Sequence, residues 1–161
     1  MVTAGGGRGF SLIELMVVLA IGALLMLVAA PLTKTWVDNA TVRQTTFRLQ
    51  EGMSQAKALA LRNVGGKTVA EPAAYLVLTA GQACVFTEAP KGLSCEGKPA
   101  WQAPFKAAVQ MDGKTSGCIA LNNQAVSARG AAIGDSACGS GSYVVSYGNG
   151  RYPQDGSQSL F

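Results

Sequence analysis

The feature that most constrains this chain is an apolar run close to its start. Between Phe10 and Thr33 the only charged residue is Glu14. A helix needs about 20 consecutive apolar residues to cross a hydrocarbon core roughly 30 Å thick. We therefore expect residues 10–32 to form a hydrophobic helix that can span a membrane, which leaves the later residues to build any folded domain.

The flanks of this run differ from those of an ordinary signal peptide. Residues 1–9 form a short leader whose single basic residue is Arg8, so almost no basic region precedes the apolar segment. Glu14 lies inside the run, where an ionisable group costs roughly 3 kcal/mol unless it is paired. Ser11 and Glu14 also fit a helix capping box, but capping does not explain a carboxylate in a segment bound for lipid.

A known signal has this order of residues. Gly9-Phe10-Ser11-Leu12-Ile13-Glu14 followed by an apolar helix resembles the class III signal of type IV pilins and type II secretion pseudopilins. The resemblance implies that a prepilin peptidase cleaves after Gly9 and methylates the new N-terminus at Phe10, while the hydrophobic segment is kept. It also implies that Glu14 of one subunit neutralises the terminal ammonium of Phe10 in a neighbouring subunit.

Pro31 closes the apolar run. Proline lacks an amide hydrogen and clashes with the preceding turn, so it should kink or locally melt the helix near residues 27–30. Pilins commonly carry a proline at the corresponding place, and the resemblance assigns the loosened turn to subunit packing and assembly.

The length and net charge of the chain limit what the residues outside the apolar helix can form. At 161 residues, the chain has room for one domain of ordinary size beside the apolar helix. The net charge is +4, and removing a leader that holds the one charge of Arg8 leaves +3. The basic residues are scattered, which indicates a solvated surface rather than a dedicated site for anionic polymers.

The cysteines point to an oxidising compartment. Four of them lie beyond the apolar run, at Cys84, Cys95, Cys118 and Cys138, and the chain has no histidine. Without a histidine or a Cys-x-x-Cys pair a metal site is not expected, and an even count in an exported domain indicates disulfides. Three connectivities are possible. We favour Cys84 with Cys95 and Cys118 with Cys138, because each pair closes a short local loop; free buried thiols are the alternative.

Residues 33–64 should continue as an amphipathic helix that packs on the globular domain. Apolar residues recur there at spacings of three, four and seven, with charged residues between them. Asn63 and the two glycines after Val64 end the pattern, since glycine accepts the left-handed cap conformation. The predicted buried stripe consists of Trp36, Ala40, Phe47, Leu49, Met53, Ala56, Leu59 and Ala60.

Residues 65–161 indicate an antiparallel β-sheet domain. A hairpin is expected around Ala80-Gly81-Gln82, and turn signals separate short apolar segments further on. The fold class is therefore α+β, a pilin-like fold in which a long N-terminal helix packs on a C-terminal sheet. The expected strands are residues 75–79, 83–87, 105–111, 118–121, 124–128 and 143–147.

Two later stretches support a closer resemblance. Residues 49–63, which end in an Ala-rich Arg62-Asn63 segment, and residues 143–151, which run into Gly150-Arg151, are similar to the GspH/FimT/FimU group of minor pilins and pseudopilins. In that group the last strand runs into a Gly-Arg turn.

No catalytic residues, cofactor or metal are predicted. Gly66-Lys67-Thr68 and Gly113-Lys114-Thr115 lack the first glycine of a phosphate-binding loop. Ser54 and Lys57 fit a Ser-x-x-Lys spacing, but this spacing arises readily by chance on a helix face. The lack of histidine also removes the commonest general base.

Arg151 is the one basic residue that indicates a ligand. Some FimT-like pilins that bind DNA carry Gly-Arg-x-Arg in this region, whereas this chain has Gly150-Arg151-Tyr152-Pro153 and lacks the second arginine. Tyr147 and Tyr152 could stack on single-stranded nucleic acid, although aromatic residues at a strand end more often pack in the core.

These patterns favour a structural, non-enzymatic role as a minor pilin of a type IV pilus, in its tip or initiating complex. The alternatives are a GspH-type pseudopilin of a type II secretion system and a DNA receptor for natural transformation. The expected partners are other pilins through the N-terminal helices, prepilin peptidase, an inner-membrane assembly platform, inner-membrane lipid and, least favoured, DNA. The chain should cross the inner membrane once, with its domain in the periplasm, before it enters a filament.

Overall fold

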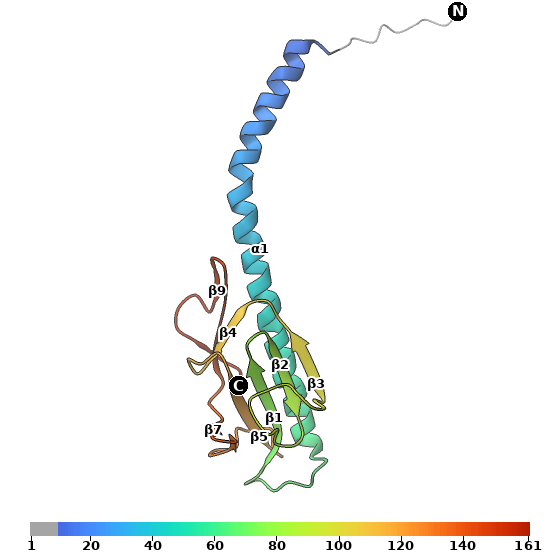
Figure 1. Ribbon diagram of the computed structural model, residues 1–161, viewed down its shortest axis with the longest axis vertical. Helices are drawn as coiled ribbons and strands as arrows, with labels where there is room; N and C mark the ends of the chain where they lie inside the picture. Colours follow the sequence, from blue (N-terminus) through green and yellow to red (C-terminus); the bar gives the residue numbers. More distant parts are fainter. Residues whose placement is uncertain (1–9) are drawn as a thin grey trace, which may run out of the picture. The chain divides into compact units, whose positions relative to one another are not determined.

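The computed structural model describes residues 10–161, apart from the side chains of residues 28–32 (Figure 1). This part of the chain is α+β: one long helix, α1 (Leu12–Arg62), precedes ten short strands. The chain divides into two compact units, Met1–Trp36 and Val37–Phe161. Gly9 lies outside the described residues, as does the side chain of Pro31. The backbone of α1 is helical throughout residues 27–31, so the predicted local melting is not observed, and the kink stays a prediction.

In the first unit, α1 presents its apolar side chains to the solvent. Every residue from Phe10 to Leu27 is exposed except Gly22, which is half-buried. The described residues include no helix that is both long enough and apolar enough to cross a membrane. The expected membrane span at residues 10–32 is thus not confirmed by the structure and remains a prediction.

In the second unit, one face of α1 is buried. Its buried residues recur at intervals of three and four, as an amphipathic helix requires. Leu49, Met53, Ala56 and Ala60 are in the predicted stripe, and Leu59 packs against the same core. The buried positions from 37 onward are Asp38, Val42, Thr45, Thr46, Leu49, Gly52, Met53, Ala56 and Ala60.

Three residues of the predicted stripe point the other way. Trp36, Ala40 and Phe47 are exposed, with Trp36 at 72% and Phe47 at 69% of their full accessible area. About 3.6 residues make one turn, so Phe47 lies nearly opposite Leu49 on the helix. The interpretation of Trp36, Ala40 and Phe47 as core residues was wrong, because hydrophobicity was given more weight than phase.

A residue in the left-handed backbone conformation ends α1. Asn63 has φ 43°, and its N–H donates to the carbonyls of Leu59 and Ala60 at 3.1 and 3.2 Å. The Asn63 side chain then binds the backbone of Lys67 twice, accepting from its N–H at 2.7 Å and donating to its carbonyl at 2.9 Å. The predicted stop is at the right place, but Asn63 takes the cap conformation at the helix end and Gly66 takes it within the turn that follows.

The larger sheet has the order β3-β2-β1-β5, with antiparallel pairs throughout (Figure 1). Its hairpin joins Thr79 to Gln82 across Ala80 and Gly81, and Gly81 adopts φ 98°, as a tight turn favours. The strands are β1 (Pro72–Thr79), β2 (Gln82–Phe86), β3 (Trp101–Pro104) and β5 (Gly117–Asn122).

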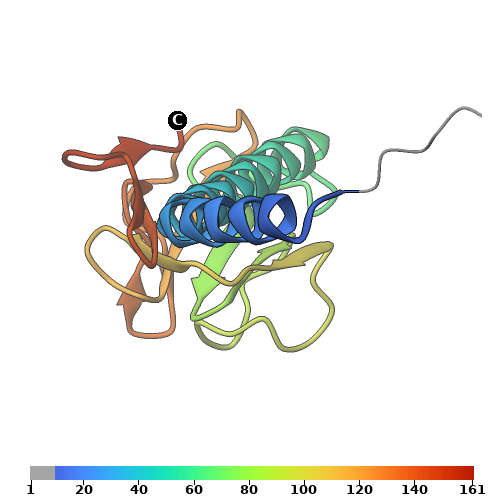
Figure 2. The same cartoon turned by 90° about the horizontal axis from the view of Figure 1, so that it is seen from above.

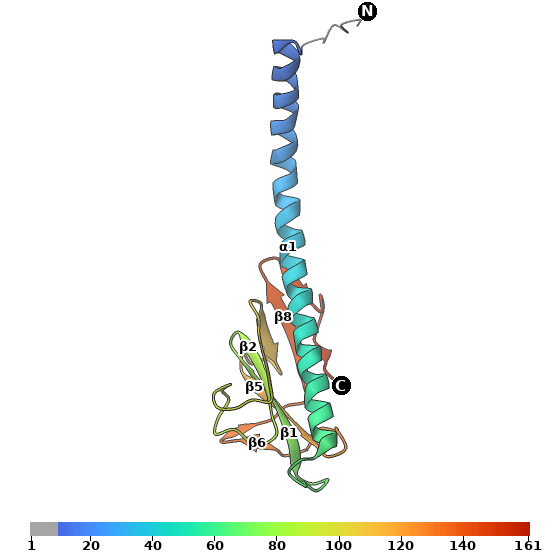
Figure 3. The same cartoon turned by 90° about the vertical axis from the view of Figure 1, so that its right-hand side faces the viewer.

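A second sheet has the order β10-β8-β4, and β9 also pairs with β8. A small hairpin forms separately from β6 and β7. Figure 3 shows β8 running alongside α1 in the second unit. The bounds are β4 (Ala108–Met111), β6 (Ala132–Ile133), β7 (Ser136–Ala137), β8 (Ser142–Tyr147), β9 (Gly150–Tyr152) and β10 (Gln158–Ser159).

Two hydrophobic clusters lie on either side of the larger sheet. The main core joins the buried face of α1 to Leu76 and Leu78 of β1 and to inward residues of the second sheet. The other cluster holds Tyr75 and Val77 of β1 together with both disulfides, Cys84–Cys95 and Cys118–Cys138. These are the pairings that the cysteine spacing favoured.

Two predicted strands differ from the structure. The segment 105–111 is interrupted, because the Phe105 N–H still donates to the Gly81 carbonyl of the first hairpin at 2.8 Å whereas Ala108 pairs with Ser146. The chain therefore changes sheets at residues 105–107. The segment 124–128 is a turn, because the side-chain oxygen of Asn122 accepts from the N–H groups of both Gln124 and Val126 at 3.1 Å.

Candidate functional site

The start of α1 is solvent-exposed. Phe10 and Ser11 precede the helix, and the Leu15 N–H donates to the Ser11 carbonyl at 3.2 Å. Phe10 is 82% exposed. Of the two residues of the predicted processing site, Phe10 is therefore accessible, and Gly9 lies in the part of the chain that the structure does not describe.

Glu14 lies in the first turn of α1 and is exposed among apolar neighbours. A carboxylate there interacts favourably with the helix dipole. Within residues 10–161 its carboxylate has no hydrogen-bond or ion-pair partner, and the bonds of the alternative capping box with Ser11 are not formed. Glu14 thus offers a free negative charge beside an exposed apolar surface.

The turn between β8 and β9 is fixed to the helix by a buried carboxylate. Asp38 is 5% exposed, and its Oδ2 accepts a hydrogen bond from the Asn149 N–H at 3.1 Å. Gly148 has φ 54°, and a Cβ there would overlap the Asp38 carboxylate; a Cβ on Gly150 would meet Val42 Cγ2 at 3.0 Å. The turn at residues 148–150, which leads into Gly150-Arg151, therefore docks against α1.

Arg151 and its two neighbouring tyrosines do not form one surface. Residues opposite each other in an antiparallel pair share a face, and successive residues alternate. Arg151 pairs with exposed Ser146, whereas Tyr152 pairs with Val145 of the core, and its ring lies 6.4 Å from that of Tyr143. Tyr147 alternates onto the face of Val145, so the structure separates Arg151 from Tyr147 and Tyr152.

Ser54 and Lys57 lie on an exposed part of α1. The Ser54 hydroxyl donates to the Gln50 carbonyl at 2.9 Å, and the Lys57 ammonium lies 5.5 Å from the centre of the Phe161 ring. Ser54 and Lys57 thus make other contacts, which agrees with the interpretation of the Ser-x-x-Lys spacing as a chance match.

The comparison with known families bears on the first helix. Residues 7–30 match the model of the prokaryotic N-terminal methylation motif. The chain carries a type IV prepilin-like signal. This prepilin-like signal contains Gly9, Phe10 and Glu14 and stops one residue before Pro31. It implies processing by a prepilin peptidase and assembly with other pilins. No curated protein and no solved structure matches the chain.

The sequence interpretation missed Asp38. Its position four residues before Val42 places it in the buried stripe, which is unusual for a carboxylate because burial costs energy unless the charge is hydrogen-bonded. A buried charge in phase with the core could therefore have indicated that a backbone turn docks there. Which turn docks could not be predicted, because Asn149 lies 111 residues away.

Proposed function

We propose that this chain is a minor pilin with a pilin-like fold, which assembles into a type IV pilus as part of its tip or initiating complex. The observation that carries the proposal is the exposed apolar helix behind the prepilin-like signal, with Glu14 unpaired within the described residues. An exposed apolar surface of this extent needs a lipid or protein partner. The role is structural, and no catalytic residue or cofactor enters it.

The residues divide the work of assembly. Cleavage after Gly9 and methylation at Phe10 produce a mature chain whose first residues are apolar. Residues 10–32 hold the subunit in the inner membrane, with the disulfide-bonded domain in the periplasm. On assembly, Glu14 neutralises the terminal ammonium of a neighbouring subunit, since an unpaired charge in lipid is costly, and Pro31 loosens the helix for packing.

A pseudopilin of the GspH type would have the same signal and the same helix. Deleting the gene and measuring piliation, exoprotein secretion and natural transformation in one strain separates the possible machines. Loss of piliation with normal secretion supports the pilus proposal, and loss of secretion alone contradicts it in favour of a pseudopilin.

DNA binding forms the third arm of the same test. Arg151 has no second arginine beside it, and Tyr147 and Tyr152, although partly exposed, lie on the opposite face of the strand pair. Loss of transformation with normal piliation would contradict the structural role proposed here. A salt-sensitive gel shift of the full chain that disappears in Arg151→Gln would then identify the residue responsible.

A further inference from the structure

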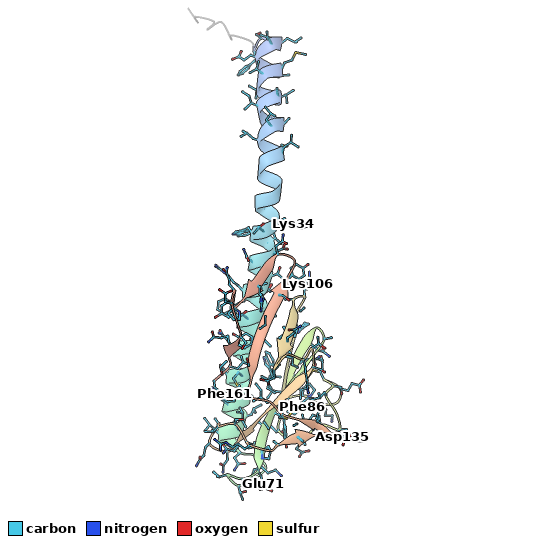
Figure 4. The ribbon with its side chains drawn as sticks, turned by 90° about the vertical axis from the view of Figure 1, so that its left-hand side faces the viewer. Lys34, Glu71, Phe86, Lys106, Asp135 and Phe161 are labelled. Carbon is cyan, nitrogen blue, oxygen red and sulfur yellow. A yellow bond between two sulfur atoms is a disulfide. The ribbon has the colours of Figure 1, made fainter. Side chains whose placement is uncertain are left out.

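A groove of about 360 Å³ lies between α1 and the connection from β3 to β4. The helix forms one wall, and the Phe105 ring and Pro104 form an apolar wall opposite. Figure 4 labels Lys106, one of the residues that line the groove, and shows it far from Asp135. The lining residues are Thr41, Gln44, Thr45, Arg48, Pro104, Phe105 and Lys106.

The charged residues of the groove are cationic. Arg48 uses one guanidinium nitrogen, Nη1, to bind Glu51 Oε2 at 3.0 Å, and its remaining N–H donors stay available. Lys106 is exposed and has no ion pair within the described residues. Two cations next to an apolar wall suit a carboxylate carried on a short aliphatic stem.

The acidic side chains of the second unit can be compared for this role. The carboxylates of Asp38, Glu51, Glu71 and Asp112 already accept hydrogen bonds within the domain. Glu88 and Glu96 line a depression that also contains Lys91 and Lys98, which balance their charge. Asp135 and Asp155 remain, both exposed and without a partner in the described part of the chain.

Position distinguishes these two residues. Asp135 lies in the turn between β6 and β7, and Figure 4 shows it far from Lys106 along the domain. Asp155 lies in the connection from β9 to β10, which Figure 1 shows at the level where β4 begins. When two copies lie side by side with their helices parallel, segments at the same height along the helix axis come together. The groove and the connection that holds Asp155 lie at similar heights, which favours Asp155 over Asp135.

The connection holding Asp155 and the groove lie on opposite flanks of α1. Gly150, at the start of β9, approaches Asn39 and Val42, whereas the groove is lined by Thr41 and Arg48. At about 100° per residue, Asn39 and Thr41 point to opposite sides of the helix. Figure 2, viewed from above, shows β9 and β3 on different sides of α1.

We infer that the groove binds residues 153–157 of a second copy of this chain, with Asp155 between Arg48 and Lys106. The inference rests on the assembly role proposed above and names a contact surface for it. Because the two patches differ, the contact between the two copies is head-to-tail rather than a symmetric dimer. Exposed residues on both sides, including Gln154 and Gly156, leave the connection free to enter.

A photo-crosslinking amino acid at Lys106 of the full-length chain, in living cells, tests the contact. The expected product is a covalent dimer of this chain, with the crosslink mapped by mass spectrometry to residues 153–157. The same probe at Lys98, an exposed lysine in a different depression, is the matched control and should give no such dimer. Crosslinks from Lys106 to another protein, or to another segment of this chain, would overturn the inference.

Charge reversal provides a second measurement. Asp155→Lys with a probe at Gln44 should lower the dimer yield roughly five- to tenfold, because an attraction becomes a repulsion in a partly buried site. Adding Lys106→Glu should restore most of the yield, whereas a fold defect would not be rescued. No loss in Asp155→Lys, or no rescue, contradicts the proposed pairing.

The sheared filament fraction of the same cells separates the two proposals. Chain present in filaments without the Lys106 dimer overturns the docking contact and leaves the minor pilin role in place. Chain absent from filaments, with the dimer still formed, contradicts the pilus role and supports the docking contact.

Discussion

At the scale of single residues, the turn between β8 and β9 contains a glycine that is required for two separate reasons. Gly148 needs a positive φ, and it also needs the absence of a side chain where Asp38 approaches. Gly156 has φ 71° with nothing within 4 Å of an added Cβ. Substitutions at Gly148 and Gly156 therefore separate the free-energy cost of a positive φ from the cost of a clash with Asp38.

Gly148→Ala should lower the free energy of unfolding by about 3 kcal/mol, because the displaced Asp38 loses its hydrogen bond with Asn149 in addition to the backbone strain. Gly156→Ala should cost about 1 kcal/mol from backbone strain alone. Chemical denaturation of the full chain in detergent measures both. Equal losses in the two variants would show that the contact with Asp38 contributes little.

Glu14→Gln should leave leader removal and membrane association unchanged and should reduce incorporation into filaments roughly tenfold, because the charge that pairs with a neighbour's ammonium is lost. Immunoblots of the membrane and sheared filament fractions measure this ratio. Glu96→Gln is the control, since Glu96 is an exposed carboxylate outside α1 and outside the groove that contains Arg48. Equal incorporation of Glu14→Gln and wild type would rule out the charge-pairing role.

At the scale of elements, α1 shows what hydrophobicity alone predicts well and what it does not. The helix, its end at Asn63 and the inward positions Leu49 and Met53 follow from the sequence because they share one period. Phe47 did not, because an apolar residue on the outward face carries the same hydrophobic signal as a buried one. Phase relative to the whole stripe is the information that distinguishes them.

Leu49→Ala and Phe47→Ala form a matched pair on α1. Leu49 is fully buried and Phe47 is mostly exposed, so Leu49→Ala should cost about 2–5 kcal/mol of unfolding free energy and Phe47→Ala less than about 0.5 kcal/mol. Denaturant titration of both variants checks the difference. A large loss for Phe47→Ala would contradict the orientation of this helix in the second unit.

The two disulfides should stabilise the domain by similar amounts. Their cysteines are 11 and 20 residues apart, and closing such loops in the unfolded chain is worth about 3 kcal/mol each, with a few tenths more for the longer loop. Replacing each pair by alanines and measuring thermal unfolding tests this. A loss confined to one pair would show that the other does not constrain the unfolded chain.

At the scale of the whole molecule, the sequence predicted the class of the fold better than the connections within it. The α+β class, the first hairpin and the cysteine pairs depend on local spacing, and the structure has all three. In the second sheet, β8 and β4 lie in predicted strands, but β9 and β10 were missed because they are very short and pair only through β8. The four-residue strand β3 of the larger sheet was also missed. Asp38 and the groove beside Lys106 were missed for the same reason, since both depend on contacts between distant segments.

Processing governs everything that the molecule does afterwards. Replacing Gly9 by a bulky residue such as leucine should block leader removal, so that the chain keeps residues 1–9 and stays out of filaments. Mass spectrometry of the purified chain measures this, and Gly6→Leu, three residues earlier in the leader, serves as the control. A mature chain that starts at Phe10 in the Gly9 variant would show that this glycine does not define the cleavage site.

The two clusters on either side of β1 have a practical consequence. The helix-facing core is built without the cysteines, so the segment closed by Cys84 and Cys95 lies on the side of the sheet away from α1. An epitope tag inserted between Pro90 and Ser94 would therefore be held at both ends by a covalent bridge and would leave the helix-side packing untouched. That loop is the natural place to label the subunit for imaging or to display a foreign peptide.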